Sequence, residues 1–251
     1  MVQLRGDDKA RYVASMFDRI SRRYDLMNTV MSGGMHHLWR RRATHLATQE
    51  DQGEAPSTSS GQALDVATGT GDFALDLARR PGIERVVGLD FAPKMLPLAR
   101  DKAQRHDLSH HASWMLGDAQ SLPFQDDRFL CITCGFGLRN FSDKEAALKE
   151  MTRVARPGGR VVILDIVPLV GGGVFHRLLR GCFRGVVPQL GALLGGNKEA
   201  YKYLPDSVDN FLTAQELSAM MESVGLQNVR YETMGIGTVA VHVGEKPTMA
   251  T

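Results

Sequence analysis

Short apolar runs alternate with amphipathic runs from residue 63 onward. Ala63–Val66 has the composition of a buried strand, and Phe73–Arg79 shows helical spacing. Further strand-like runs follow at 84–90, 110–116, 129–135, 160–165, 229–233 and 238–243. Strands that alternate with helical stretches are typical of a parallel sheet with crossover helices. We therefore predict an α/β fold with a Rossmann-like, seven-stranded sheet whose last strand returns antiparallel.

The first 47 residues carry a helical pattern instead. Val13, Phe17, Ile20 and Tyr24 recur every three or four positions, which places them on one helix face. Because these helices precede the first strand, they are able to fold over a site at the sheet edge. Plain packing on the sheet fits the same pattern, and the spacing favours neither arrangement. We assign residues 1–47 as an N-terminal helical lid.

Two further segments differ in composition from the rest of the chain. Residues 48–62 contain no large apolar side chain, so we predict a flexible linker loop before the main domain at 63–251. Apolar residues and arginines are interleaved after Val167, and we predict an apolar helical insertion at 167–212 that caps an acceptor molecule. Such a stripe suits contact with a membrane or a greasy substrate, although burial against the core is more common.

A glycine turn joins the first predicted strand to its helix. Gly69 and Gly71 let bare backbone approach a ligand at the helix N-terminus. The next strand ends in Asp90, nineteen residues after Gly71, and this spacing suits a carboxylate that binds a ribose diol. Gly69-x-Gly71-x-x-Ala74 also matches the dinucleotide fingerprint formally. The turn therefore predicts a nucleoside site without choosing the nucleoside.

Two acids near the turn indicate which nucleoside binds. Asp72 places a negative charge at the helix N-terminus, where a pyrophosphate would sit, and Asp65 adds a second carboxylate on the strand. S-adenosylmethionine carries a sulfonium, an ammonium and a ribose but no phosphate. We therefore predict this cofactor in preference to NAD. A simple helix-capping role for Asp72 is compatible with that choice.

Polar residues follow the later strands at the same edge of the sheet. Asp118, with the neighbouring backbone N–H, suits the amino group and ring nitrogen of adenine, and an Asx-type turn is a strong competing explanation. Gly135 and Gly137 again let backbone approach the cleft. Arg139 and Asn140 follow where an acceptor would enter. An ion pair at the start of the next helix is the alternative role for Arg139.

Composition and charge exclude several classes of protein. The 251 residues have a formal net charge of +2, which gives no global field for nucleic acid. Cys131 and Cys134 are three apart in a predicted strand, so we expect them on opposite faces as core residues and not as a metal or redox pair. We find neither a signal-peptide pattern nor an apolar run near the roughly 18 residues of a spanning helix. We expect a cytoplasmic protein that needs no metal.

Longer motifs resemble the ubiquinone/menaquinone biosynthesis C-methyltransferase family. The most specific pieces are Tyr24-Asp25-Leu26-Met27-Asn28 and Phe136-Gly137-Leu138-Arg139-Asn140. The other pieces are Val13-Ala14-x-Met16-Phe17-Asp18-x-Ile20, Leu38-Trp39, Ala67-x-Gly69-Thr70-Gly71-Asp72, Leu122-Pro123-Phe124, Tyr203-Leu204-x-x-Ser207 and His242-x-Gly244. Together they span nearly the whole chain. One departure is Gly135, which stands where the family commonly has Ser.

The resemblance implies the fold of a class I S-adenosylmethionine-dependent methyltransferase. It also implies transfer of a methyl group to a ring carbon of a prenylated quinol, which yields S-adenosylhomocysteine. The acceptor would be demethylmenaquinol, or the benzoquinol of the ubiquinone pathway. The glycine turn and the resemblance together predict the residues that contact the cofactor. They are Asp65, Gly69, Thr70, Gly71, Asp90, Asp118, Ala119 and Gly135. The resemblance places the catalytic residues Tyr24, Arg139 and Asn140 beside the acceptor.

A hydrophobic, prenylated acceptor has consequences for where the protein acts. We expect peripheral contact at the inner face of the membrane, and a homodimer is compatible with the sequence. Three other functions remain open. They are a methyltransferase acting on another hydrophobic phenol or a sterol, an NAD-dependent oxidoreductase, and a lipid-binding module without catalysis.

Overall fold

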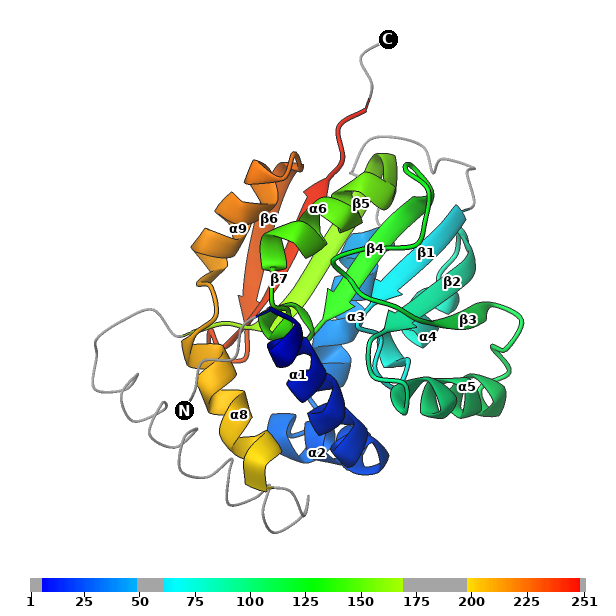
Figure 1. The fold of residues 1–251 in the computed structure, drawn as a ribbon. Helices are drawn as coiled ribbons and strands as arrows, with labels where there is room; N and C mark the ends of the chain where they lie inside the picture. The colour runs from blue at the N-terminus through cyan, green and yellow to red at the C-terminus, as the bar shows by residue number, and fades with distance from the viewer. Residues whose placement is uncertain (1–5, 49–60, 169–197, 249–251) are drawn as a thin grey trace.

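The computed structural model describes residues 6–48, 61–168 and 198–248. Its centre is a seven-stranded sheet in the order β3-β2-β1-β4-β5-β7-β6 (Figure 1). The strands are β1 (Gly61–Val66), β2 (Ile83–Asp90), β3 (Ala112–Leu116), β4 (Phe129–Gly135), β5 (Ala155–Ile166), β6 (Gln227–Met234) and β7 (Val239–Glu245). β1 to β5 pair in parallel, whereas β7 runs antiparallel to both neighbours. The predicted Rossmann-like sheet with an antiparallel last strand is confirmed.

Helices cover both faces of this sheet and one of its ends. They are α1 (Gly6–Ile20), η1 (Ser21–Arg23), α2 (Tyr24–Ser32), α3 (His36–Thr48), α4 (Asp72–Ala78), α5 (Met95–Arg105), η2 (Leu138–Asn140), α6 (Lys144–Val154), α8 (Lys198–Asp209) and α9 (Ala214–Ser223). Neighbouring strand residues alternate between two apolar clusters. Leu64 joins the cluster that contains α6 and α9, whereas Ala63 joins the one that contains α3 and α4. The period of two along the strands thus builds both halves of the core.

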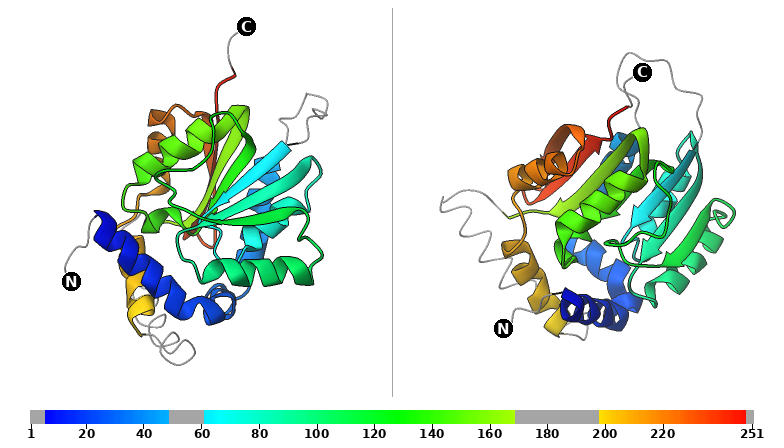
Figure 2. Two further views of the ribbon diagram at one scale, coloured as in Figure 1. Left: turned by 45° about the vertical axis from the view of Figure 1, so that its right-hand side comes forward. Right: turned by 45° about the horizontal axis from the view of Figure 1, so that its top comes forward.

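The three N-terminal α-helices occupy two different places in the fold. α3 packs on the sheet through Ala43, Leu46 and Ala47, which are nearly or fully buried in the core. α1 and α2 form a small core of their own around Met16 and Met27, and they lie at the end of the sheet toward which the parallel strands run (Figure 2). α3 therefore packs on the sheet, whereas α1 and α2 lie at this end of it, and a lid function for residues 1–47 stays a prediction.

Some expectations concern features away from the site. Cys131 and Cys134 are buried on opposite faces of the sheet, as predicted. Most of the predicted linker, at 49–60, and of the predicted insertion, at 169–197, lies outside the described residues. Among the helices that the structure describes, each is too short or too polar to cross a bilayer.

Candidate functional site

A pocket opens where β1, β2 and β4 end, and α1 closes one side of it. It encloses about 760 Å³ of empty space, a volume that includes open solvent at its mouth. Of the predicted site residues, the lining contains Tyr24, Gly69, Asp90, Asp118, Ala119, Gly135 and Asn140. The strand ends and the glycine turn thus predicted much of the lining, and the family resemblance added Tyr24.

The glycine turn at the end of β1 is shaped by what lies beneath it. Gly69 and Gly71 have φ angles of 55° and 84°, a region that glycine adopts at little cost. A Cβ on Gly71 would lie 2.6 Å from the Trp114 ring, and a Cβ on Gly88 would meet the same ring at 2.6 Å. The indole of Trp114 therefore supports the turn from below, and only glycine fits against it.

Asp90 ties the end of β2 to this turn. Its carboxylate accepts hydrogen bonds from the backbone N–H of Gly69 at 2.7 Å and of Ala92 at 2.8 Å. Burial raises the pKa of Asp90 to about 6, although both backbone hydrogen bonds counteract the shift. A carboxylate accepts roughly four hydrogen bonds. Asp90 lines the pocket, so its remaining capacity is available to a diol.

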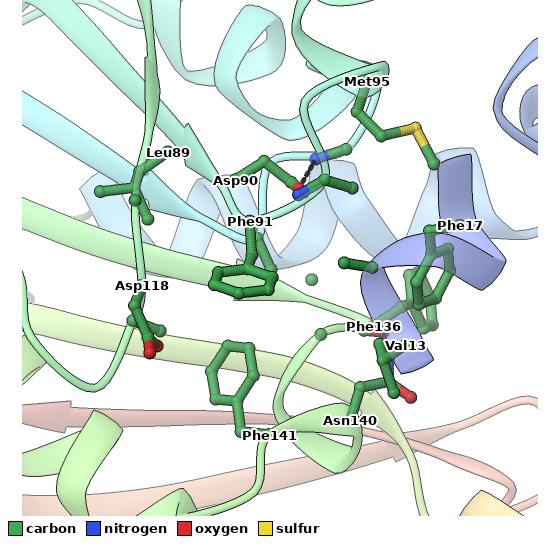
Figure 3. Close-up of a pocket in the computed structure, with 18 of the residues that line it drawn as sticks. Val13, Phe17, Leu89, Asp90, Phe91, Met95, Asp118, Phe136, Asn140 and Phe141 are labelled. Carbon is green, nitrogen blue, oxygen red and sulfur yellow. Dashed lines mark hydrogen bonds between the residues drawn. The ribbon is translucent and has the colours of Figure 1, made fainter. Parts of the chain in front are cut away.

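Two aromatic rings lie near Asp118 in the pocket. The Asp118 Oδ1 accepts a hydrogen bond from the backbone N–H of Gln120 at 2.9 Å, so the Asx-type turn is present, and the residue lines the pocket as well. Figure 3 shows the rings of Phe91 and Phe141 beside it. Phe91 is 43% exposed although it is a large aromatic residue. Sequence reasoning missed Phe91, whose position directly after Asp90 was the available signal.

Asp65 lies outside the pocket lining. It is 1% exposed, and its carboxylate accepts hydrogen bonds from the hydroxyls of Thr68 at 2.6 Å and Thr133 at 2.7 Å and from the backbone N–H of Ala74 at 3.1 Å. Burial raises the pKa of Asp65 to about 7. Its oxygens are engaged within the fold, so it joins β1, β4 and α4 and does not face the ligand.

Asp72 does not present a free charge to the pocket either. Its carboxylate pairs with Arg40 at 3.1 Å and with Lys102 at 2.6 Å. Burial alone would raise the pKa of Asp72, but the two cations outweigh burial and lower it. The helix cap is Gly71 and has no side-chain hydrogen bond, so Asp72 is not a capping residue. The electrostatic argument against a pyrophosphate is therefore wrong, because both acids near the turn are already compensated.

Thr70 and Gly71 also lie outside the lining. The Thr70 hydroxyl donates to Asp25 of α2 at 2.6 Å, and Thr70 is 3% exposed. These two predicted cofactor contacts shape the turn from its far side.

Asn140 lines the pocket at a distance from Asp118, next to Val13 (Figure 3), and Tyr24 lines the same pocket above Gly69. Asn140 is 6% exposed, and its Nδ2 donates to the carbonyl oxygen of Phe136 at 3.3 Å. The Asn140 Oδ1 is buried and has no hydrogen-bond partner within the described protein. An unsatisfied buried acceptor costs about 1–3 kcal/mol. This part of the pocket is therefore suited to a ligand that brings a hydrogen-bond donor.

Arg139 lies behind the lining. Its Nη1 contacts the Asp165 carboxylate at 2.5 Å and the carbonyl oxygen of Phe136 at 2.5 Å, and its backbone N–H donates to Asp165 at 3.1 Å. The ion-pair alternative is therefore present. Burial would lower the pKa of Arg139, but Asp165 outweighs it and the pKa is raised. The Nε is buried without a partner in the described protein, and Tyr24 and Tyr203 lie within electrostatic range of the guanidinium.

Two of the six non-glycine residues with a positive φ in the described chain follow β1 and β4. Ala67 and Phe136 line the pocket and have φ angles of 54° and 57°, which non-glycine residues rarely adopt. A Cβ on Gly137 would lie 2.6 Å from the Ala67 Cβ, so the two turns pack against each other. A Cβ on Gly135 would lie 2.7 Å from the Phe73 ring, which accounts for the glycine at this position.

Comparison with known proteins gives concordant matches. The model of the ubiE/COQ5 methyltransferase family matches residues 5–246. Demethylmenaquinone methyltransferase of Thermus thermophilus is 47% identical over 92% of this chain and 100% of its own, and that of Deinococcus radiodurans is 44% identical over 95% and 94%. The ubiquinone/menaquinone biosynthesis C-methyltransferase UbiE of Geotalea daltonii is 38% identical over 95% and 98%.

Solved structures match the fold at low sequence identity. The [4+2]-cyclase SpnF superposes with a TM-score of 0.65 at 19% identity, covering 94% of this chain and 95% of its own. An S-adenosylmethionine-dependent methyltransferase of Thermotoga maritima, described as a possible histamine N-methyltransferase, gives 0.62 at 19% identity over 92% and 98%. The predicted class I fold is confirmed.

Proposed function

The chain belongs to the ubiE/COQ5 methyltransferase family, and from this premise we propose that it methylates a ring carbon of a prenylated quinol with S-adenosylmethionine. Demethylmenaquinol is the proposed acceptor, because the relatives that are 47% and 44% identical are named for that substrate. The UbiE relatives, at 36–39% identity, are named for both quinone pathways, so the benzoquinol is the second candidate.

The polar residues of the pocket suit this cofactor. When bound, S-adenosylmethionine supplies an electrophilic methyl group. Asp90 would hold the ribose hydroxyls, and Asp118 with the backbone N–H of Ala119 would hold the adenine edge. The exposed ring of Phe91 offers a face for stacking. Gly69 and Gly135 have no side chains, so the backbone can approach the cofactor closely.

The single observation that carries the acceptor proposal is the unpaired Oδ1 of Asn140. The hydroxyl of a reduced quinol supplies the donor that this buried oxygen lacks. Tyr24 lines the same pocket and would restrain the ring from the lid. Val13 and Phe17 add apolar surface there.

The reaction requires a nucleophilic ring carbon. Loss of a proton from a ring hydroxyl moves electron density onto the ortho carbon, which then receives the methyl group. That carbon afterwards loses its hydrogen as a proton and the ring oxygen regains one, so the aromatic quinol is restored with a net release of one proton. Arg139 stays protonated, so it serves as an electrostatic stabiliser of the anionic ring oxygen and not as the base. A water molecule oriented at the site takes the proton. Arg139 lies outside the pocket lining and interacts electrostatically with Tyr24, so we propose that its charge acts on the acceptor together with the tyrosine.

Membrane contact, oligomeric state and the role of the 167–212 segment are further parts of the proposal. We propose peripheral contact with the inner membrane surface, because a prenylated acceptor resides in the bilayer. Homodimer formation and a role for the 167–212 segment stay predictions.

One experiment tests the proposed function directly. Purified protein is incubated with demethylmenaquinol and cofactor carrying a labelled methyl group, and the product is analysed by mass spectrometry. We expect a ring C-methyl product. Transfer only to an oxygen, or only to a sterol, would redirect the proposal to another acceptor. Tight binding of NAD with no methyl transfer would refute it.

A further inference from the structure

A compact ionic cluster joins the lid to the glycine turn. Lys102 of α5 donates through Nζ to Asp25 at 2.7 Å, to Asp72 at 2.6 Å and to the Thr70 hydroxyl at 3.0 Å. Thr70 also donates to the second oxygen of Asp25 at 2.6 Å. One ammonium group thus connects α2 of the lid, the turn after β1 and the start of α4.

The cluster is sheltered from solvent on its cationic side. The side chain of Lys102 is 12% exposed and that of Arg40, which pairs with Asp72, is 10% exposed. Asp25 is 46% exposed and is the outermost member. Hydrogen bonds to charged groups in such partly buried positions are stronger than surface ion pairs, because solvent screens them less.

Asp25 is adjacent to Tyr24, which lines the pocket. A Cβ on Gly69 would lie 3.7 Å from Tyr24 Cε1, so the tyrosine ring packs directly over the turn. The position of α2 therefore sets how closely this ring lies over the turn. Movement of Asp25 away from Lys102 would move Tyr24 with it.

Two other polar contacts hold α1 independently of this cluster. Lys9 donates to the carbonyl oxygen of Phe141 at 2.8 Å, and Asp18 accepts from the backbone N–H of Lys94 at 3.0 Å. Loss of the Asp25 contacts would therefore loosen α2 while α1 stays attached.

We propose that Asp25 and Lys102 are positioning residues that fasten α2, and with it Tyr24, to the glycine turn and thereby control exchange of the cofactor. The proposal rests on the proposed function, since it names the nucleoside as the molecule whose exit is controlled. Neither residue touches the pocket, so both act through Thr70 and Tyr24.

The test uses Asp25→Asn and Lys102→Met, which remove charge at nearly constant size, and Lys102→Arg as the conservative variant. Arg42→Gln is the matched control. It breaks the ion pair of Arg42 with Glu232, which also joins an N-terminal helix to the sheet domain but lies outside the cluster. Thermal unfolding confirms that each variant is folded.

Two measurements follow on each variant. The first is hydrogen exchange of the backbone amides in residues 6–32 without ligand. The second is the dissociation rate of S-adenosylhomocysteine, followed by tryptophan fluorescence, since Trp114 supports the turn. We expect both charge-removing variants to exchange faster over α2 and to release the nucleoside about tenfold faster, consistent with loss of one charged hydrogen bond. Lys102→Arg and Arg42→Gln should resemble the unaltered protein.

The two measurements test the fastening of α2 and the control of cofactor exchange separately. Exchange over α2 at the unaltered rate in both charge-removing variants would refute the fastening role. Faster exchange with unchanged dissociation would refute the control of cofactor exchange. If the unaltered protein binds no S-adenosylhomocysteine, the proposed function fails, whereas the exchange experiment still decides whether the cluster fastens α2.

Discussion

The pair formed by Arg139 and Asp165 allows catalysis to be separated from stability. Both side chains are nearly or fully buried, with Nη1 and Oδ1 2.5 Å apart. Replacement of Arg139 by Met removes the charge and leaves Asp165 buried without its cation. Asp165→Asn leaves the opposite imbalance. The double variant removes both charges. The backbone N–H groups of Arg139 and Ile166 donate to different oxygens of Asp165, so the single amide oxygen of Asp165→Asn keeps one of these two hydrogen bonds.

The replacements should affect the free energy of unfolding and the turnover number in different ways. Removal of one partner of a buried ion pair destabilises a protein by about 3–5 kcal/mol. Removal of both is often close to neutral, so the double variant should be more stable than either single variant. Turnover should not recover in this way, because the charge near the acceptor is still absent. We expect Arg139→Met and the double variant each to lose about 10²–10³-fold in kcat, as for the loss of one electrostatic stabiliser.

The assay combines urea denaturation with steady-state turnover of demethylmenaquinol at saturating cofactor. The affinity for S-adenosylhomocysteine is measured in parallel and should change little, because Arg139 is outside the pocket lining. Turnover near the unaltered level in the double variant would refute the electrostatic role and leave Arg139 as a purely structural cation. Equal destabilisation in all three variants would contradict the ion-pair argument.

Three further predictions concern Asp65, the glycine turn and Phe91. The pKa of Asp65 is raised by burial to about 7, above the ordinary value of 3.8, so its neutral form favours folding; this contribution is complete below about pH 4 and is lost as pH rises through 7, and Asp65→Asn should flatten that part of the urea-unfolding profile. An unchanged slope would argue against the shift. Gly71→Ala places a Cβ 2.6 Å from Trp114 at a φ of 84°, so it should lower the melting temperature and weaken S-adenosylhomocysteine binding, as measured by fluorimetry and calorimetry, whereas Gly82→Ala, also at positive φ but with no atom within 4 Å of the added Cβ, should spare binding. Phe91→Ala should raise the dissociation constant of S-adenosylhomocysteine about three- to tenfold by loss of stacking, with kcat nearly unchanged; an unaltered constant would remove Phe91 from the site.

Periodicity and strand-end chemistry located much of the molecule in advance. The alternation after residue 63 predicted the sheet, and Asp90, Asp118 and Gly135 line the pocket because parallel strands end at one edge. The choice of S-adenosylmethionine over NAD agrees with the family, yet the electrostatic reason for it was wrong. The sequence placed Asp65 and Asp72 near the turn, but it could not reveal that Thr68, Thr133, Arg40 and Lys102 compensate them.

The remaining errors have a common cause. Contacts between residues far apart in the chain, such as Lys102 with Asp25 or Arg139 with Asp165, leave no local pattern to recognise. Phe91 was overlooked because a single aromatic residue after a strand is usually a core residue, and only its 43% exposure marks it as available to a ligand.

The Phe73 ring against Gly135 couples two positions that are 62 residues apart in the chain. A side chain at 135 and the phenyl ring at 73 compete for the same volume, so position 135 cannot receive a side chain while Phe73 is retained. A serine grafted at 135 would be tolerated only after position 73 had first been reduced in size. Residues taken from a homologue should therefore be introduced at positions 73 and 135 together. A replacement at position 135 alone would wrongly suggest that the fold rejects a side chain there.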